Sequence, residues 1–215
     1  GASANTTEDG VVNVGGALAY GIAAQDTAFH SAVIAGNTIW YSGGNTSPGT
    51  TFSIAGNIAA GTFGTSTTII YLKGYKLTRG DSCVGAYRPT IACAAFTIAA
   101  HNTYCSTQNL IFTGTGASIY TVPATCVLIN CKSTNSSTTA NQTAFAASSS
   151  NCYFIGCEAS SLNGYAFAPT FGSTFVGCYA HDSKTGINMA SGGSTILNSV
   201  METCTNGVGP ANLAK

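Results

Sequence analysis

The sequence predicts an all-β protein in which short strands wind into a solenoid of stacked coils. Three observations support this fold class. A segment with the same order of residue types recurs along the second half of the chain, and a unit of about 20 to 50 residues is typical of solenoids. A glycine or an asparagine stands at the same point of each unit. Hydrophobic residues make up 45% of the 215 residues and charged residues only 7%, so a large apolar core must be built with few charges.

The repeated unit is clearest around four positions at successive intervals of 26, 21 and 21 residues: Cys131, Cys157, Cys178 and Ser199. Three residues before them stand Leu128, Phe154, Phe175 and Ile196. Two residues after them stand Ser133, Ala159, Ala180 and Met201, and earlier in each unit Cys126 and Cys152 align with Ser173 and Ser194. Alternate side chains of a strand share one face. We therefore expect these columns to point into the core of coils of about 21 residues.

The residue before each of the four positions is Asn130, Gly156, Gly177 or Asn198. Glycine and asparagine adopt the left-handed backbone conformation at the lowest cost. A strand that ends in such a residue and restarts after a sharp bend is the expected corner of a β-solenoid. One coil cannot bury its apolar face alone, but stacked coils can.

Nine cysteines are present, and five of them fall in the repeated inward columns. No spacing typical of a zinc site occurs, so no metal or cofactor is expected. We interpret the repeated cysteines as small apolar side chains that fill the core as free thiols. Disulfides between neighbouring coils are the alternative, because strands one coil apart lie about 4.8 Å from each other, which a disulfide can span.

Upstream the repeat is less regular, although segments 68–75, 91–100 and 109–116 still read as strands that end in turns;. Asp26 is placed to cap a short N-terminal helix that extends through Val33, and we expect this capping helix to cover the first coil. Residues 1–24 are predicted to form an N-terminal extension that could serve assembly, and residues 25–215 to form one parallel β-helix domain.

These repeats resemble the single-stranded, right-handed parallel β-helix proteins of the pectin-lyase-like superfamily. Residues 74–81, GYKLTRGD, followed by residues 88–93, RPTIAC, also look like a turn-and-restart segment of β-helix proteins from bacteria and phages. The resemblance covers roughly residues 25–210. It implies the fold but several functions, because this fold carries lyases, hydrolases, phage tail spikes and structural solenoids.

Enzymes of this superfamily cut polysaccharides with clustered carboxylates, so the resemblance draws attention to acids that the repeat brings together. His181 and Glu202 share one column, and Asp182 lies beside them. These three are the candidate catalytic residues, with Asp182 and Glu202 as the carboxyl pair, and a hydrogen-bonded surface cluster is the simpler interpretation. Glu158 is expected to stack on Lys132 as a surface salt bridge.

The column of Ile129, Ile155, Val176 and Leu197 has the opposite parity to the Leu/Phe column and should face outward. An aliphatic stripe on the outside of a solenoid usually meets a loop or another chain, so this column is a candidate assembly stripe. The last regular coil is followed by GVGPANLAK without an evident capping helix, which favours head-to-tail stacking;. Asn5, Asn45, Asn135 and Asn141 begin glycosylation sequons;.

Composition narrows the choice of function. Seven basic and seven acidic residues cancel, which disfavours nucleic acid as a partner;. No run approaches the roughly 20 apolar residues of a membrane span. The favoured hypothesis is a non-catalytic structural solenoid, extracellular, on a cell surface or on a virion, as a fibre, filament or tail-spike-like subunit. It would associate with itself as a homo-oligomer or head-to-tail polymer, with polysaccharide as a second candidate partner. The alternative is a polysaccharide lyase or glycoside hydrolase.

Overall fold

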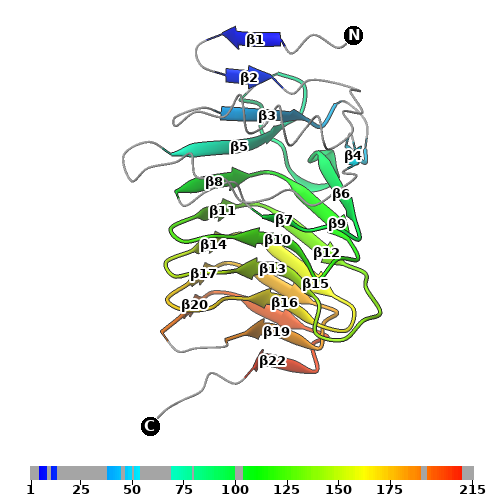
Figure 1. Ribbon diagram of the computed structural model, residues 1–215, viewed down its shortest axis with the longest axis vertical. Helices are drawn as coiled ribbons and strands as arrows, with labels where there is room; N and C mark the ends of the chain where they lie inside the picture. The colour runs from blue at the N-terminus through cyan, green and yellow to red at the C-terminus, as the bar shows by residue number, and fades with distance from the viewer. Residues whose placement is uncertain are drawn as a thin grey trace.

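The computed structural model of the chain is a parallel β-solenoid whose coils stack along one long axis (Figure 1). It describes residues 5–8, 11–13, 38–44, 47–49, 51–53, 69–78, 80–99, 104–189 and 193–209. Within these ranges the structure is all-β, apart from one short 3-10 turn at Gly85–Tyr87. The predicted fold class is thus confirmed, whereas the helix predicted from Asp26 to Val33 and the boundary after residue 24 lie outside the described residues.

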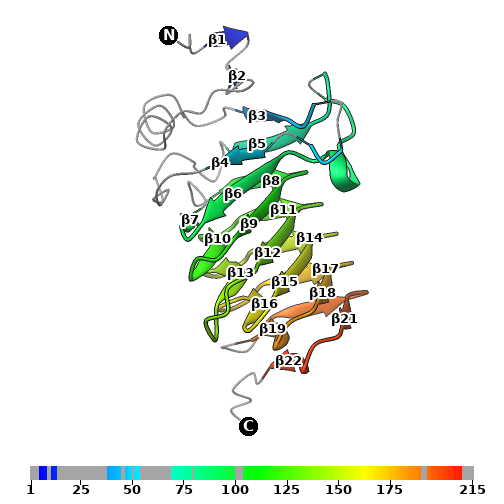
Figure 2. The same cartoon turned by 90° about the vertical axis from the view of Figure 1, so that its right-hand side faces the viewer.

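The strands form three sheets, which we call A, B and C, and each regular coil adds one strand to each sheet (Figure 2). Sheet A contains β1 (Asn5–Glu8), β2 (Val11–Asn13), β3 (Thr38–Ser42), β5 (Ile70–Tyr75), β8 (Cys105–Gln108), β11 (Val127–Ile129), β14 (Tyr153–Ile155), β17 (Thr174–Val176) and β20 (Thr195–Leu197). Sheet B contains β4 (Thr51–Ser53), β6 (Thr90–Ala94), β9 (Ile111–Gly114), β12 (Lys132–Asn135), β15 (Glu158–Ser161), β18 (Tyr179–His181) and β21 (Val200–Glu202). Sheet C contains β7 (Ile98–Ala99), β10 (Ser118–Val122), β13 (Thr143–Ala147), β16 (Tyr165–Ala168), β19 (Thr185–Asn188) and β22 (Asn206–Gly209). All pairs within the sheets are parallel except β1 with β2.

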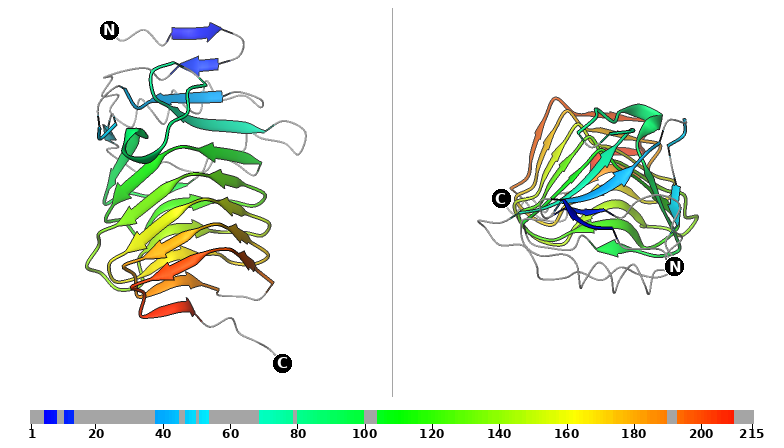
Figure 3. Two further views of the ribbon diagram at one scale, coloured as in Figure 1. Left: turned by 180° about the vertical axis from the view of Figure 1, so that it is seen from behind. Right: turned by 90° about the horizontal axis from the view of Figure 1, so that it is seen from above.

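The predicted columns are in register. Phe154 pairs with Phe175, and Phe175 pairs with Ile196 one coil further on. The rings of Phe154 and Phe175 stack with their centroids 4.9 Å apart and their planes 7° apart. Seen from above, the three sheets surround one interior (Figure 3), and buried side chains from all three sheets fill it as a single apolar core.

The corner between sheets A and B has the predicted left-handed residues. Positive φ angles occur at Asn109 (57°), Asn130 (51°), Gly156 (59°), Gly177 (61°) and Asn198 (49°). The side-chain amide of Asn130 donates to Oδ1 of Asn109 at 2.8 Å, so amides of successive coils bond along the corner. This conformation turns the chain sharply enough for the next strand to begin two residues later.

All nine cysteines carry free thiols, and eight of them are buried, with Cys204 partly exposed. Thiols of one coil donate to backbone carbonyls of the coil before, as Cys178 Sγ does to the Phe154 oxygen at 3.2 Å. Burial raises the pKa of Cys93 and of Cys105 to about 12. The five cysteines of the repeated columns, Cys126, Cys131, Cys152, Cys157 and Cys178, are all buried in the apolar core, as the packing interpretation predicts.

The corner between sheets B and C is formed by turns of unequal length. Between paired strand residues it contains residues 136–142 in one coil, then 162–164, 182–184 and 203–205 in the next three. The long turn contacts the next coil, since Asn163 Nδ2 donates to the Thr138 oxygen at 2.9 Å. The first of these turns is therefore longer than the three that follow it.

Candidate functional site

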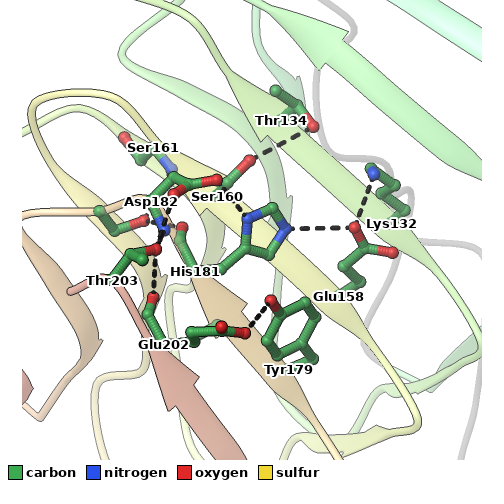
Figure 4. Close-up of polar contacts among 12 residues, drawn as sticks. Lys132, Thr134, Glu158, Ser160, Ser161, Tyr179, His181, Asp182, Glu202 and Thr203 are labelled. Carbon is green, nitrogen blue, oxygen red and sulfur yellow. Dashed lines mark hydrogen bonds and ion pairs between the residues drawn. The ribbon is translucent and has the colours of Figure 1, made fainter.

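The charged residues of the later coils gather on the outer face of sheet B (Figure 4). Lys132, Glu158, His181 and Glu202 come from β12, β15, β18 and β21, one from each successive coil. They alternate along their strands with the inward residues Ser133, Ala159 and Ala180, which are buried. The alternation of a β-strand thus places this row on the surface while the small residues between them pack in the core.

His181 lies between two carboxylates. Its Nδ1 is 2.8 Å from Oδ2 of Asp182, and its Nε2 is 3.1 Å from Oε1 of Glu158. The same Glu158 oxygen accepts a hydrogen bond from Lys132 Nζ at 2.6 Å. Because a carboxylate oxygen only accepts, both contacts of the ring are hydrogen bonds together only when the imidazole carries a proton on each nitrogen.

Asp182 has the left-handed backbone that asparagine and aspartate tolerate, with a φ of 46°;. Its Oδ1 accepts from the Thr203 hydroxyl at 2.6 Å, and its backbone N–H donates back to the same hydroxyl at 3.0 Å. The side chain is nevertheless 69% exposed. The carboxylate is therefore held in one orientation and still open to a ligand.

Glu202 has a different partner. The Tyr179 hydroxyl donates to its Oε2 at 2.5 Å, and this bond raises the pKa of the tyrosine to about 12. The Tyr179 ring stacks on the His181 ring with centroids 4.7 Å apart. The tyrosine and the histidine, two residues apart on β18, therefore pack face to face between the carboxylates of three coils.

The surroundings favour the ionised form of two of the carboxyl groups. Burial opposes the charge of Glu158, but hydrogen bonds and charge from Lys132 and His181 outweigh it and hold the pKa of Glu158 below its ordinary value. The bonds from Thr203 and then His181 lower the pKa of Asp182. A general acid for sugar cleavage needs the opposite shift, because it must be protonated at working pH.

A depression of about 380 Å³ lies beside this cluster at the B–C corner. It is lined by Leu162, Asn163, Asp182, Ser183, Lys184, Thr203 and Thr205. All seven belong to the turns 162–164, 182–184 and 203–205, so the depression extends over three coils. Lys184 is held at its edge, because Nζ donates to Oδ1 of Asn141 at 3.2 Å.

The structure brings the sequence-predicted residues together only in part. His181 pairs with Glu202 across β18 and β21, as predicted, but its side chain bonds to Asp182 and Glu158. Glu158 also forms the predicted bridge to Lys132. The contact from His181 to Glu158 is diagonal, since the residue directly opposite His181 is Ser160. Ser160 has a small side chain, so the His181 ring can extend past it to Glu158. This is the one feature of the sequence that indicates the contact.

The candidate assembly stripe lies on the outer face of sheet A. Ile129 pairs with Ile155, Ile155 with Val176 and Val176 with Leu197. Ile155 is 38% exposed and Leu197 50% exposed. Ile129 and Val176 are half-buried, so the column is in register across four coils and most exposed at Ile155 and Leu197.

The sequons differ in their surroundings. Asn135 is buried, and its amide donates to the backbone oxygens of Gly116 and Thr143 at 2.8 Å and 3.0 Å. The folded chain leaves no room for a glycan there. Asn141 is exposed and remains a candidate. The side chain of Asn5 and the whole of Asn45 lie outside the described residues.

The fold and its surface define a class, the parallel β-solenoids with coils of about 21 residues. No family model matches the chain, and searches of curated proteins and of solved structures find no match either. Among the described residues no helix is long and apolar enough to cross a membrane. No group of three or more His, Cys, Asp or Glu residues that could hold a metal ion occurs in this part of the chain.

Proposed function

We propose that this protein is a non-catalytic structural subunit, of the pectin-lyase-like, surface or tail-spike kind, that pairs with further copies of itself through the outer face of sheet A. The observation that supports the proposal is the composition of that face. Strands β11, β14, β17 and β20 present two outward residues each, and none of the eight is charged. They are Val127, Ile129, Tyr153, Ile155, Thr174, Val176, Thr195 and Leu197.

The exposed apolar residues of this face adjoin one another, whereas most exposed apolar residues on a protein surface stand singly. Tyr153 is 45% exposed and stands next to Ile155 on the same strand face. Contiguous exposed apolar patches on soluble proteins mark interaction sites. A second copy fits as the occupant because the part of the face formed by β11, β14, β17 and β20 carries no charge, so two such surfaces can meet about a two-fold axis without like charges opposing each other;. The outward Lys73 of sheet A lies on β5, two strands before β11.

Polysaccharide cleavage by Asp182, Glu202 and His181 has less support. A glycosidase of either kind needs a carboxyl group whose pKa is raised, so that it can donate a proton, whereas the pKa of Asp182 is lowered. Glu202 is engaged by Tyr179. The side chains of the cluster are therefore better suited to stabilise the outer face of sheet B than to transfer protons.

Sedimentation of the purified chain tests the assembly. We expect the wild type to form dimers or larger species at micromolar concentration, and Ile155→Asp to shift the population to monomer, because a buried carboxylate without a partner is costly. Val200→Asp is the matched control. Val200 is 56% exposed but belongs to sheet B, so its substitution should leave assembly unchanged. A monomeric wild type, or equal dissociation by both variants, would contradict the proposal.

A further inference from the structure

We propose that His181 is a pH-sensitive link between two coils of the solenoid, closed when its ring is protonated and open when the ring is neutral. The closed link joins the end of β18 to Glu158 on β15, a strand of the preceding coil. The inference does not rest on the self-association proposed above, because it concerns the outer face of sheet B.

The ring is one member of a row of side-chain contacts that spans four successive coils (Figure 4). Lys132 Nζ on β12 donates to Oε1 of Glu158 at 2.6 Å, and the same oxygen lies 3.1 Å from Nε2 of His181. On the other side of the ring, Nδ1 lies 2.8 Å from Oδ2 of Asp182. Oδ1 of Asp182 accepts from the hydroxyl of Thr203, which follows β21, at 2.6 Å. The row is therefore continuous only while both ring nitrogens bond to their carboxylates.

The protonation state of the imidazole decides whether both bonds exist. A carboxylate oxygen only accepts, so each contact needs an N–H group on the ring. The protonated ring has two N–H groups, whereas the neutral ring has one and turns a lone pair toward the other carboxylate. The His181 side chain is only 16% exposed and its ring stacks on Tyr179, which holds it in this orientation. Loss of the proton therefore breaks one of the two contacts.

The contact with Glu158 is the one that the neutral ring gives up. The distance from Nδ1 to Asp182 is the shorter of the two, 2.8 Å against 3.1 Å. Asp182 is also fixed by Thr203, which bonds to its carboxylate and accepts from its backbone N–H at 3.0 Å. Glu158 keeps its bond to Lys132 when the ring releases it. The remaining proton thus stays on Nδ1, and the side-chain link between β15 and β18 opens.

No other group around the ring is expected to change charge near neutral pH. Bonds and charge hold the pKa values of Glu158 and Asp182 below their ordinary values, and the bond to Glu202 raises the pKa of Tyr179 to about 12. Histidine is the side chain that ordinarily changes charge between about pH 5 and 8. The link is therefore closed at the acidic end of this range and opens as the pH rises. The titratable and charged residues on the elements packed around the ring are Lys132 on β12, Glu158 on β15, Tyr179 on β18, Asp182 and Lys184 in the turn 182–184, and Glu202 on β21.

A double-mutant cycle of His181→Gln and Glu158→Gln, measured by urea unfolding at about pH 5.5 and about pH 8, tests the link. At the lower pH, we expect Glu158→Gln to raise the unfolding equilibrium constant about threefold more in the wild-type background than in the His181→Gln background. At the higher pH, Glu158→Gln should have the same effect in both backgrounds. The other two histidines of the chain are present in every variant, so their titration cancels from the comparison.

The matched control is the cycle of Lys132→Met and Glu158→Gln, because it measures the other partner of the same carboxylate. A lysine keeps its charge at both pH values, so this coupling should not change. Nitrogen-15 spectra of the His181 ring provide a second readout, with both nitrogens protonated at the lower pH and only Nδ1 at the higher. The proposal is overturned if the coupling of His181 to Glu158 is absent at the lower pH, if it is as large at the higher pH, if the Lys132 coupling changes equally, or if the neutral ring carries its proton on Nε2.

Discussion

Ser173 stands in an inward column that Cys126 and Cys152 occupy in the two preceding coils. It is fully buried, and its hydroxyl has no hydrogen-bond partner. A buried polar group without a partner costs free energy that an apolar group does not. The thiols of the same column avoid that cost, because sulfur is only weakly polar and Cys152 Sγ still donates to the Pro123 oxygen at 3.0 Å;.

Ser173→Cys should therefore stabilise the protein. Removing the unsatisfied hydroxyl and extending the thiol column is expected to raise the free energy of unfolding by about 1 to 2 kcal/mol, measured by urea denaturation. Ser133→Cys is the control, because the Ser133 hydroxyl donates to the Ala144 oxygen at 2.9 Å and would lose that bond. Equal effects of the two substitutions would contradict this explanation.

The position of the Arg88 side chain could not be predicted from the sequence, whereas the inward and outward columns could be predicted from the alternation of residues along each strand. This side chain is only 6% exposed, and its Nη1 donates to the Asn130 oxygen at 2.8 Å across 42 residues of sequence. It ties the loop that contains the 3-10 turn to the A–B corner. Nothing in the local pattern around Arg88 indicates such a contact, because it depends on how an irregular loop folds back.

At the scale of elements, the A–B corner is the most regular feature of the chain. Its left-handed residue is asparagine or glycine in each of the five coils from Asn109 to Asn198. Asn130 bonds to Asn109 through their side-chain amides, whereas Gly156 and Gly177 interrupt the row. A Cβ atom at either glycine would meet nothing within 4 Å. The corner therefore has space for the longer side chain.

Gly156→Asn together with Gly177→Asn should stabilise the solenoid. Asparagine tolerates the positive φ, restricts the unfolded chain more than glycine does and can continue the amide row, so we expect a gain of about 0.5 to 1 kcal/mol in thermal or urea unfolding. The matched control is Gly156→Val, since a β-branched residue is strained at this φ and should destabilise by about 1 kcal/mol or more. A loss of stability in the asparagine variant would refute the argument.

The inward columns of sheets A and B recur at regular intervals in the sequence and could therefore be predicted. The inward column of sheet C recurs at less regular intervals and is harder to predict. The column Tyr120, Phe145, Phe167 and Ile187 is continuous in the structure. In the sequence it is obscured, because the turns that precede it vary from residues 136–142 to residues 182–184. The depression at the B–C corner could not be foreseen either, because nothing in the sequence indicates how the side chains of three successive turns are placed around it.

At the scale of the whole molecule, each coil contacts mainly the coils above and below it, so stability is close to a sum of coil and interface contributions. Phe154 is placed where several of these contributions meet. Its ring stacks on Phe175 and also packs against Phe145 and Phe167, at centroid distances of 6.1 Å and 5.6 Å. By contrast, Val208, which lies in the last described coil, is exposed.

Phe154→Ala should consequently lower the free energy of unfolding by about 3 to 5 kcal/mol, the usual cost of removing a buried aromatic ring. Val208→Ala is expected to cost less than about 0.5 kcal/mol. Chemical denaturation of both variants provides the comparison. Similar losses for the two would mean that the coils do not share one continuous core.

The nine free thiols bear on how the chain folds. Since no cysteine is linked to another, no bond has to be oxidised for the coils to stack. In the folded state eight of the nine cysteines are buried, so the interior is shielded from thiol reagents in solution.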